Sequence, residues 1–244
     1  MKTLTHDQKI QIYIGVFLCL NFLMWFAIRH SQGHWQNVPP VPDKAYAALY
    51  GLGDKSFSYR LNGIMIQNLG DTGGRFTPLQ EYDYDVLAQW FFLEDYLDPN
   101  SDYIPYLVTY YFGGVQDVEK LRPILPYLEM VGERDYKEKW RWLAQAVFLA
   151  RYRLKDFTIA LRMAKTLASF ERPNMPGWAK QMPAFIQVAQ GEKKAAYSIM
   201  IELLKSSSDK LHPNEVNSMK IFICSRVLEA EEARNNPLCV DIVQ

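Results

Sequence analysis

The sequence predicts an all-α protein in which a single transmembrane helix precedes a stack of helical hairpins. Three observations support this. An uncharged apolar run of 19 residues lies near the N-terminus, later apolar residues recur at helical spacing, and an acidic residue followed by an apolar one four positions later recurs every 34 to 39 residues. No segment alternates for long enough to require a sheet.

The composition excludes several protein classes. The chain has 244 residues, of which 49% are hydrophobic, so it can bury a substantial core. Its 27 Lys and Arg balance 27 Asp and Glu, so no overall positive field recruits nucleic acid, and we expect no nucleic-acid partner. Three cysteines form neither a metal-ligand pattern nor a disulfide framework. We expect Cys224 and Cys239 to be unpaired thiols, although an oxidising compartment would allow them to pair.

Residues 1–9 form a short tail before the apolar run, which extends from Ile10 to Ile28. A helix of that length spans about 28 Å, close to the hydrocarbon thickness of a bilayer. The run is long for a cleaved signal peptide, and no small-residue cleavage site follows it. We therefore expect an uncleaved signal anchor that crosses the membrane once.

Two properties of the anchor leave alternatives open. Asn21 lies well inside the run, either as a polar residue tolerated in a single span or as a contact that associates this helix with another. Lys2 and Lys9 before the run are matched by Arg29 and Lys44 after it. The rule that positive residues flank the cytoplasmic end of a span therefore hardly distinguishes the two orientations. The short N-terminal tail favours a cytoplasmic N-terminus and an exported C-terminal domain. A cytoplasmic domain is the alternative.

The segment that follows, residues 29–53, contains Pro39, Pro40 and Pro42 and predicts a semi-rigid extended linker. His30 and His34 have the spacing of a helical metal-binding pair, but two ligands are too few, so we expect no metal.

Residues 54–234 are predicted to form the helical domain. Within residues 139–170, two apolar-periodic stretches are separated at residues 154–156, which indicates a helical hairpin. An acid at the start of a second helix caps exposed amides, while the apolar residue one turn later packs on the preceding helix. These recurring pairs are Asp83 and Leu87, Asp117 and Leu121, Asp156 and Ala160, and Glu192 and Ala196.

This pattern resembles the tetratricopeptide repeat family. Tyr152, the Asp156-Phe157 pair and Ala160 match the aromatic, turn and small-residue positions of that family, and Leu97-Asp98-Pro99 resembles its repeat-ending segment. The resemblance covers about four hairpins, in residues 54–208, and implies a stack whose first helices line a ligand groove. The sequence departs from the family pattern at Leu121, Pro123, Pro126 and Lys193.

The end of the chain is predicted to close this stack. Residues 213–234 have the pattern of one amphipathic helix with an acidic, solvent-facing end. The tail, residues 235–244, is predicted to be irregular.

A glycine-rich stretch, "GDTGGRFTPL", occupies residues 70–79. It lacks the spacing and the Lys-Ser/Thr pair of a phosphate loop. We expect a first helix over residues 58–70, a long turn up to Phe76, and a second helix that Thr77 caps with Pro78 and Gln80. The length of this turn is explained either by the backbone geometry that its glycines allow or by contact with a partner through Asp71 and Arg75.

Catalysis has little support. If Glu81, Asp83 and Asp85 lie on one helix, Asp83 points away from the other two, so the three carboxylates do not converge. We therefore expect no catalytic residues, cofactor, metal or small-molecule substrate.

The segment "KWRWLAQAVF", residues 139–148, contains the densest cluster of basic and aromatic residues. Trp140, Leu143, Ala144 and Val147 have the spacing of a core face. Three further residues, Arg141, Gln145 and Tyr152, could be either solvent-exposed side chains or partner contacts, and the sequence supports both interpretations equally.

Together these features predict a membrane-anchored helical-repeat scaffold that binds a membrane-associated protein in a cell-envelope assembly. The alternatives are an architectural subunit of a large membrane complex and an envelope enzyme that acts on glycan or lipid through carboxylates.

Overall fold

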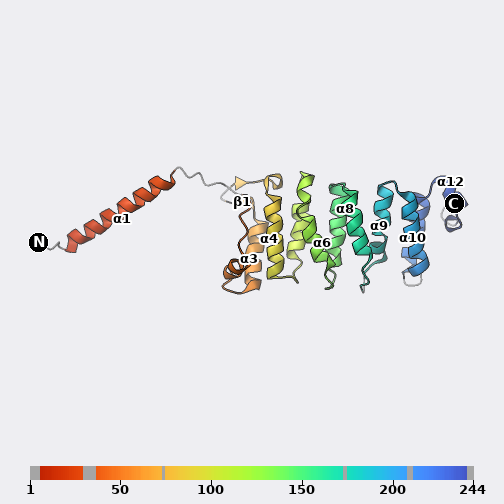
Figure 1. Cartoon of the computed structure of the whole chain (residues 1–244), viewed down its shortest axis with the longest axis horizontal. Helices are drawn as coiled ribbons and strands as arrows, with labels where there is room; N and C mark the ends of the chain where they lie inside the picture. The colour runs from red at the N-terminus through yellow and green to blue at the C-terminus, as the bar shows by residue number, and fades with distance from the viewer. Residues whose placement is uncertain (1–5, 30–36, 73–74, 173–174, 208–210, 241–244) are drawn as a thin grey trace. The chain divides into compact units, whose positions relative to one another are not determined.

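The computed structural model describes residues 6–29, 37–72, 75–172, 175–207 and 211–240. The chain divides into two compact units, residues 1–36 and residues 37–244. The described residues are almost entirely helical, as predicted (Figure 1).

The described part of the first unit consists of one long helix, α1 (His6–Ile28). Its 23 residues extend over about 34 Å, and its side chains from His6 to Ala27 are exposed on every side. The mean hydropathy of its most apolar 18-residue window is 1.9. The helix is therefore long and apolar enough to span a membrane.

The second unit begins at Asn37, before residue 54, where the domain was predicted to start from the sequence. Val38 is buried, and the Asn37 side-chain amide donates to the Glu81 carbonyl over 3.0 Å. The indole of Trp90 donates to the carbonyl of Pro39 over 2.7 Å, and α2 (Lys44–Leu49) follows. Residues 37–53 therefore belong to the domain. A proline-rich segment keeps its carbonyl groups free of helix bonds, so they can accept from the domain's side chains.

The first hairpin of the domain consists of α3 (Lys55–Gln67) and α4 (Tyr84–Leu97). Asp54 caps α3 by accepting from the amides of Ser56 and Phe57 over 2.8 and 3.2 Å. Between these helices, β1 (Asp71–Thr72) and β2 (Arg75–Phe76) form a short antiparallel pair, and η1 (Leu79–Glu81) is one 3-10 turn.

The predicted helix start at Thr77 is wrong. The Thr77 amide donates to the Gly70 carbonyl over 2.8 Å, which holds the chain in a loop. The helix begins after Asp83, whose carboxylate accepts from the amides of Asp85 and Val86 over 3.0 and 3.1 Å. The recurring acid of this hairpin is therefore the N-cap itself rather than a residue two turns inside the helix.

The remaining elements follow one another along the domain (Figure 1). They are α5 (Tyr103–Tyr106), the π-helix η2 (Leu107–Tyr111), η3 (Phe112–Gly114), η4 (Val118–Leu121), α6 (Leu125–Glu133), α7 (Trp140–Phe148), the π-helix η5 (Leu149–Arg153), α8 (Phe157–Ala168), α9 (Gly177–Ala189), α10 (Lys193–Ser207), α11 (Pro213–Phe222), the π-helix η6 (Ile223–Val227), α12 (Ala230–Asn235) and η7 (Pro237–Cys239).

Successive long helices from α6 to α10 pack on one another. The predicted hairpin in residues 139–170 is present, because α7 and η5 are followed by α8, which Asp156 caps through the Ile159 amide at 3.0 Å. The apolar members of the four recurring pairs are fully buried, and these are Leu87, Leu121, Ala160 and Ala196. In the second hairpin, the 3-10 turn η4 precedes α6, which has a proline in its first turn.

Polar contacts between helices have a regular spacing in sequence. Arg134 binds the carboxylate of Asp95, 39 positions earlier, near the end of α4. Arg172 donates to the carbonyl of Gly132, 40 positions earlier, near the end of α6. Each arginine thus places its charge at the C-terminal end of a helix one hairpin earlier, where the helix dipole favours a cation. Further contacts span 33 to 38 positions, and they join Arg162 to Glu129, Arg122 to Asp156, and Gly177 to Glu215.

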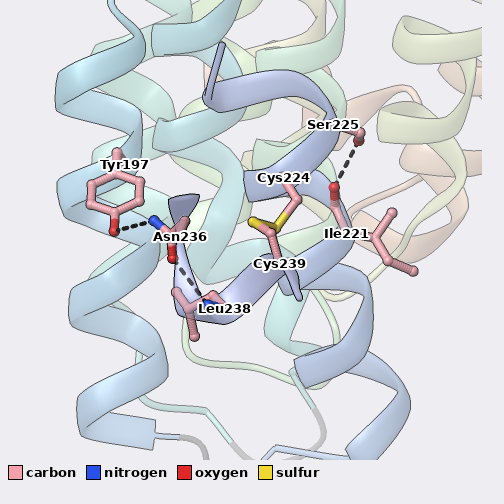
Figure 2. The surroundings of a disulfide bond; sticks show 7 residues. All are labelled: Tyr197, Ile221, Cys224, Ser225, Asn236, Leu238 and Cys239. Carbon is pink, nitrogen blue, oxygen red and sulfur yellow. Dashed lines mark hydrogen bonds between the residues drawn. A yellow bond between two sulfur atoms is a disulfide. The ribbon is translucent and has the colours of Figure 1, made fainter. Parts of the chain in front are cut away.

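The C-terminal end differs from the prediction in two ways. The expected single helix is divided, because the backbone at Leu228 is extended between η6 and α12. Cys224 and Cys239 form a disulfide with a Cα–Cα distance of 5.7 Å, so the expectation of unpaired thiols is wrong (Figure 2).

The same tail contains η7 and is therefore not wholly irregular. Asn236 fixes its start, since its side chain accepts from the Leu238 amide over 3.0 Å and donates to the Tyr197 hydroxyl over 3.2 Å (Figure 2). These contacts attach residues 236–239 to α10 and help to bring Cys239 to η6.

Candidate partner-binding surface

A hollow with a volume of about 710 Å3 lies between α5, η2 and α7. We call it the tyrosine hollow, and it is lined by Asp102, Tyr103, Tyr106, Tyr110, Arg141, Trp142 and Gln145. Its walls come from the first helices of two successive hairpins.

A polar network around the buried Lys139 includes two residues that line the tyrosine hollow, the half-exposed Asp102 and the buried Trp142. The Lys139 side chain is only 1% exposed, and its ammonium donates to the Ser101 carbonyl over 2.6 Å and to the Asp102 carboxylate over 2.8 Å. The Trp142 indole donates to the same Asp102 oxygen over 2.7 Å. Partial burial raises the pKa of the Asp102 carboxyl, but the bonds from Lys139 and Trp142 outweigh it and hold that pKa below its usual value.

This network joins the start of α7 to the start of α5 through charged, hydrogen-bonded groups. A buried lysine that lost its partner would carry a large desolvation penalty, so the two helices keep one relative position. The hollow is therefore pre-organised for binding.

Exposed aromatic rings form the walls. Tyr106 and Tyr110 are 54% and 56% exposed, and their ring centroids are 4.9 Å apart. The Tyr103 hydroxyl bonds to the Gln67 side chain, which connects the hollow to α3. Arg141 is also about half exposed and pairs with Glu138 over 3.1 Å. Tyrosine and arginine are the residues that most often dominate the binding energy of protein interfaces, so this lining suits a protein partner.

The structure brings together two of the predicted partner residues, Arg141 and Gln145, in this hollow. Tyr152 lies on η5 with its ring centroid 4.8 Å from that of Phe148, outside the lining. The predicted core face of α7 is buried, and it comprises Trp140, Leu143, Ala144 and Val147.

The three tyrosines of the hollow were not among the partner residues predicted from the sequence. In the segment "YIPYLVTYY", Tyr103, Tyr106 and Tyr110 follow a spacing of three and four residues, which places them on one side of a helix. This signal is present in the sequence, but Pro105 argues against a helix there. The structure accommodates Pro105 in the first turn of α5, where its missing amide costs no helix bond.

The other predicted contact residues lie elsewhere. Asp71 and Arg75 belong to the two-stranded hairpin, and Asp71 is not among the residues that line the tyrosine hollow. The Arg75 side chain lies outside the described part of the structure, as do Gly73 and Gly74 and the pair His30 and His34.

Gly70 has a φ of +84° within this loop, and a Cβ there would lie 2.8 Å from the Thr77 carbonyl oxygen. The described loop therefore requires a glycine at position 70 for its backbone geometry.

The prediction that Glu81, Asp83 and Asp85 lie on one helix, with the carboxylate of Asp83 pointing away from the other two, is wrong. They do not share a helix, because Glu81 ends η1 and Asp83 caps α4. All three line one hollow of about 540 Å3, together with Asp117, Glu119 and Lys120. The Asp83 carboxylate is used in capping, and no group of three or more His, Cys, Asp or Glu within the described ranges is arranged to hold a metal ion.

Asn21 of α1 donates its side-chain amide to the carbonyl of Phe17 in the same helix over 3.0 Å. This bond satisfies part of the hydrogen-bonding capacity of Asn21 without a second helix.

Comparisons with family models, curated proteins and solved structures give no match to this chain.

Proposed function

We propose that this protein is a membrane-anchored helical-repeat scaffold that binds another protein in a cell-envelope assembly through the tyrosine hollow. The observation that carries this proposal is the combination of exposed Tyr106, Tyr110 and Arg141 beside the ion pair between the buried Lys139 and the half-exposed Asp102. A pre-organised hollow lowers the entropic cost of binding, and aromatic walls with a guanidinium supply the contacts.

The regular spacing of contacts supports a tetratricopeptide-like stack. Polar contacts across 33 to 40 positions join the first hairpin to the second, the second to the third, and the fourth to α11, as in repeat proteins where each unit contacts the next. The caps at Asp83 and Asp156 and the buried Leu87 and Ala160 recur at equivalent places.

Anchoring by α1 would confine the scaffold to the membrane plane and raise its effective concentration near membrane partners. The disulfide between Cys224 and Cys239 favours an oxidising compartment for the domain. This supports a cytoplasmic N-terminus and an exported domain.

The partner segment is expected to present an apolar or aromatic side chain beside a carboxylate. The aromatic group would pack against the exposed outer surfaces of the Tyr106 and Tyr110 rings, which contact each other, while Arg141 would bind the carboxylate. Glu138 already pairs with Arg141 on the surface, so an incoming carboxylate would compete for a weak, solvent-screened contact.

Site-specific photocrosslinking tests this proposal. A photoreactive amino acid is placed at Tyr106 or Gln145 of the full chain in native membranes, with the exposed Lys165 of α8 as the control position. We expect discrete protein adducts from the two hollow positions, fewer adducts when Arg141→Glu is added, and none from position 165. Equal adducts at all three positions would contradict a specific surface.

An architectural subunit is the second candidate, because many large apolar side chains on the domain are exposed. The full chain purified in detergent distinguishes the two. A recruiting scaffold is expected to be monodisperse, whereas an orphaned subunit is expected to aggregate because its permanent interfaces are uncovered.

A further inference from the structure

The N-terminal end of the domain exposes a set of large apolar side chains on α2, the following turn and α3. We call this set the N-terminal apolar face, and it comprises Tyr46, Leu49, Tyr50, Leu52, Phe57, Leu61 and Ile64.

Helix α3 is apolar on two sides. Its inner side buries residues such as Tyr59 and Ile66. Phe57, Leu61 and Ile64, spaced by four and three residues, share the opposite side and are exposed. A surface helix normally presents polar residues to water, so an apolar outer side indicates that something other than water covers it.

The turn after α2 projects Leu52 outward. Leu52 is 93% exposed and has a φ of +55°, a conformation that costs energy for a non-glycine residue. The turn is held in place because the Gly51 amide donates to the Ser58 hydroxyl over 3.0 Å, and that hydroxyl donates to the Ala48 carbonyl over 3.2 Å. The structure thus fixes an apolar side chain in an exposed position.

Three cations lie on the elements that carry this face. From Asp43 to Gln67 the chain carries Lys44, Lys55 and Arg60, and two anions, Asp43 and Asp54. The Asp54 carboxylate already caps α3. The ammonium groups of Lys44 and Lys55 both lie over the ring of Tyr96, at 4.7 and 4.2 Å from its centroid. Lysines beside exposed tyrosines and leucines are typical of surfaces at the boundary between lipid and water.

Covalent connection limits the distance between the domain and the bilayer. Helix α1 ends at Ile28 and the domain begins at Asn37, nine positions later. A fully extended chain of that length spans at most about 32 Å. If α1 crosses the membrane, the first residues of the domain cannot leave the neighbourhood of its surface.

We infer that the N-terminal apolar face docks on the surface of the lipid bilayer that holds α1. This inference rests on the proposed membrane anchoring. Leu49, Leu52 and Ile64 enter the boundary between headgroups and acyl chains, and Tyr46 and Tyr50 lie at the headgroup level. Lys44 and Lys55 are near enough to interact with lipid phosphates.

A fluorescent probe tests the docking. The full chain with Cys19→Ser and Leu52→Cys is labelled at position 52 with an environment-sensitive dye and reconstituted alone into vesicles of phosphatidylcholine and phosphatidylglycerol. Glu231→Cys, an exposed site on α12, is the matched control. We expect blue-shifted emission at position 52 and loss of most of that emission with headgroup-nitroxide lipids, but neither effect at position 231. Adding Leu49→Ser and Ile64→Ser is expected to reverse both effects.

Equal, water-like emission at positions 52 and 231 would overturn the docking. A blue shift at position 52 without lipid quenching would also overturn it, because a second copy of the chain would then cover the face. Alkaline extraction of the same vesicles separates the two proposals. A chain that stays in the bilayer while position 52 reports water overturns only the docking, whereas a chain released from the bilayer overturns the anchoring and the docking with it.

Discussion

The two ends of the domain differ in how they meet their surroundings. The N-terminal end exposes Leu49, Leu52 and Ile64. The C-terminal end finishes in α12, where Glu229 and Glu232 form a capping box, and in a disulfide that closes the tail. A stack of helices has an open end on each side, and an end in water needs a polar cap. The comparison supports the inferred docking, because the C-terminal end carries a polar cap whereas the N-terminal end exposes an apolar face.

The largest expected effect concerns Glu94 of the first hairpin. Its side chain is fully buried, and neither carboxylate oxygen has a hydrogen-bond partner in the described part of the chain. Burial raises the pKa of Glu94 from 4.5 to about 8, although the neighbouring Asn62 amide opposes that shift. The folded protein therefore keeps this proton between pH 4.5 and pH 8, while the unfolded chain releases it.

The stability from this proton is complete below pH 4.5 and is lost as the pH rises to about 8. The free energy of unfolding should fall by about 1.4 kcal/mol per pH unit in that window. Glu94→Gln is expected to remove this dependence, measured by denaturant unfolding of the detergent-purified chain across the window, with Glu231→Gln as the exposed control. Parallel curves for wild type and Glu94→Gln would contradict the assignment of the raised pKa to Glu94. They would also argue against a buried, unpaired carboxyl group inside the N-terminal hairpin.

The disulfide should have the next largest effect, confined to the other end. Cys224→Ser with Cys239→Ser opens a loop of 15 residues, and closing such a loop is worth about 3 kcal/mol. Hydrogen exchange should show lost protection in η6, α12 and η7, while α3 and α4 keep theirs. Uniform loss of protection would mean that the C-terminal end is not a separate cap.

Helix capping allows a smaller, matched test between neighbouring hairpins. The Asp83 side chain accepts two amides at the start of α4, whereas Asp117 makes no side-chain cap bond at the start of η4. Asp83→Ala should lower the free energy of unfolding by about 1 kcal/mol, and Asp117→Ala should change it much less. Thermal unfolding of both variants checks the difference, and equal losses would show that capping is not the source of the effect.

The smallest expected effect concerns the acidic hollow near the N-terminal end. Glu81→Gln with Asp85→Asn should leave photocrosslinking from position 106 unchanged, because neither residue lines the tyrosine hollow. Loss of biological function with normal folding and normal crosslinking would favour the enzyme hypothesis instead.

Local signals predicted much of the fold. The apolar run of α1 and the cap at Asp156 depend on residues that are adjacent in sequence, so both were found. The signal at Thr77 was equally local, but it failed. Tyr82 is buried, and its hydroxyl bonds to the Leu69 carbonyl, so contacts across the loop hold residues 77–82 out of the helix.

The candidate site also combines residues that local sequence signals predicted with residues that only tertiary packing brings together. Arg141 and Gln145 were found because they lie one turn apart on a single helix. Their meeting with Tyr103, Tyr106 and Tyr110 depends on the ion pair between Lys139 and Asp102, residues 37 positions apart.

By itself, the sequence determined the apolar helix α1, the helical class and the acidic cap at Asp156, because apolar periodicity and capping act within a few residues. Only the tertiary structure decided the Cys224–Cys239 bond, the assembly of the tyrosine hollow and the exposure of the N-terminal apolar face. Each of these depends on which helices pack together, and that is set by the sum of many weak contacts between residues distant in sequence.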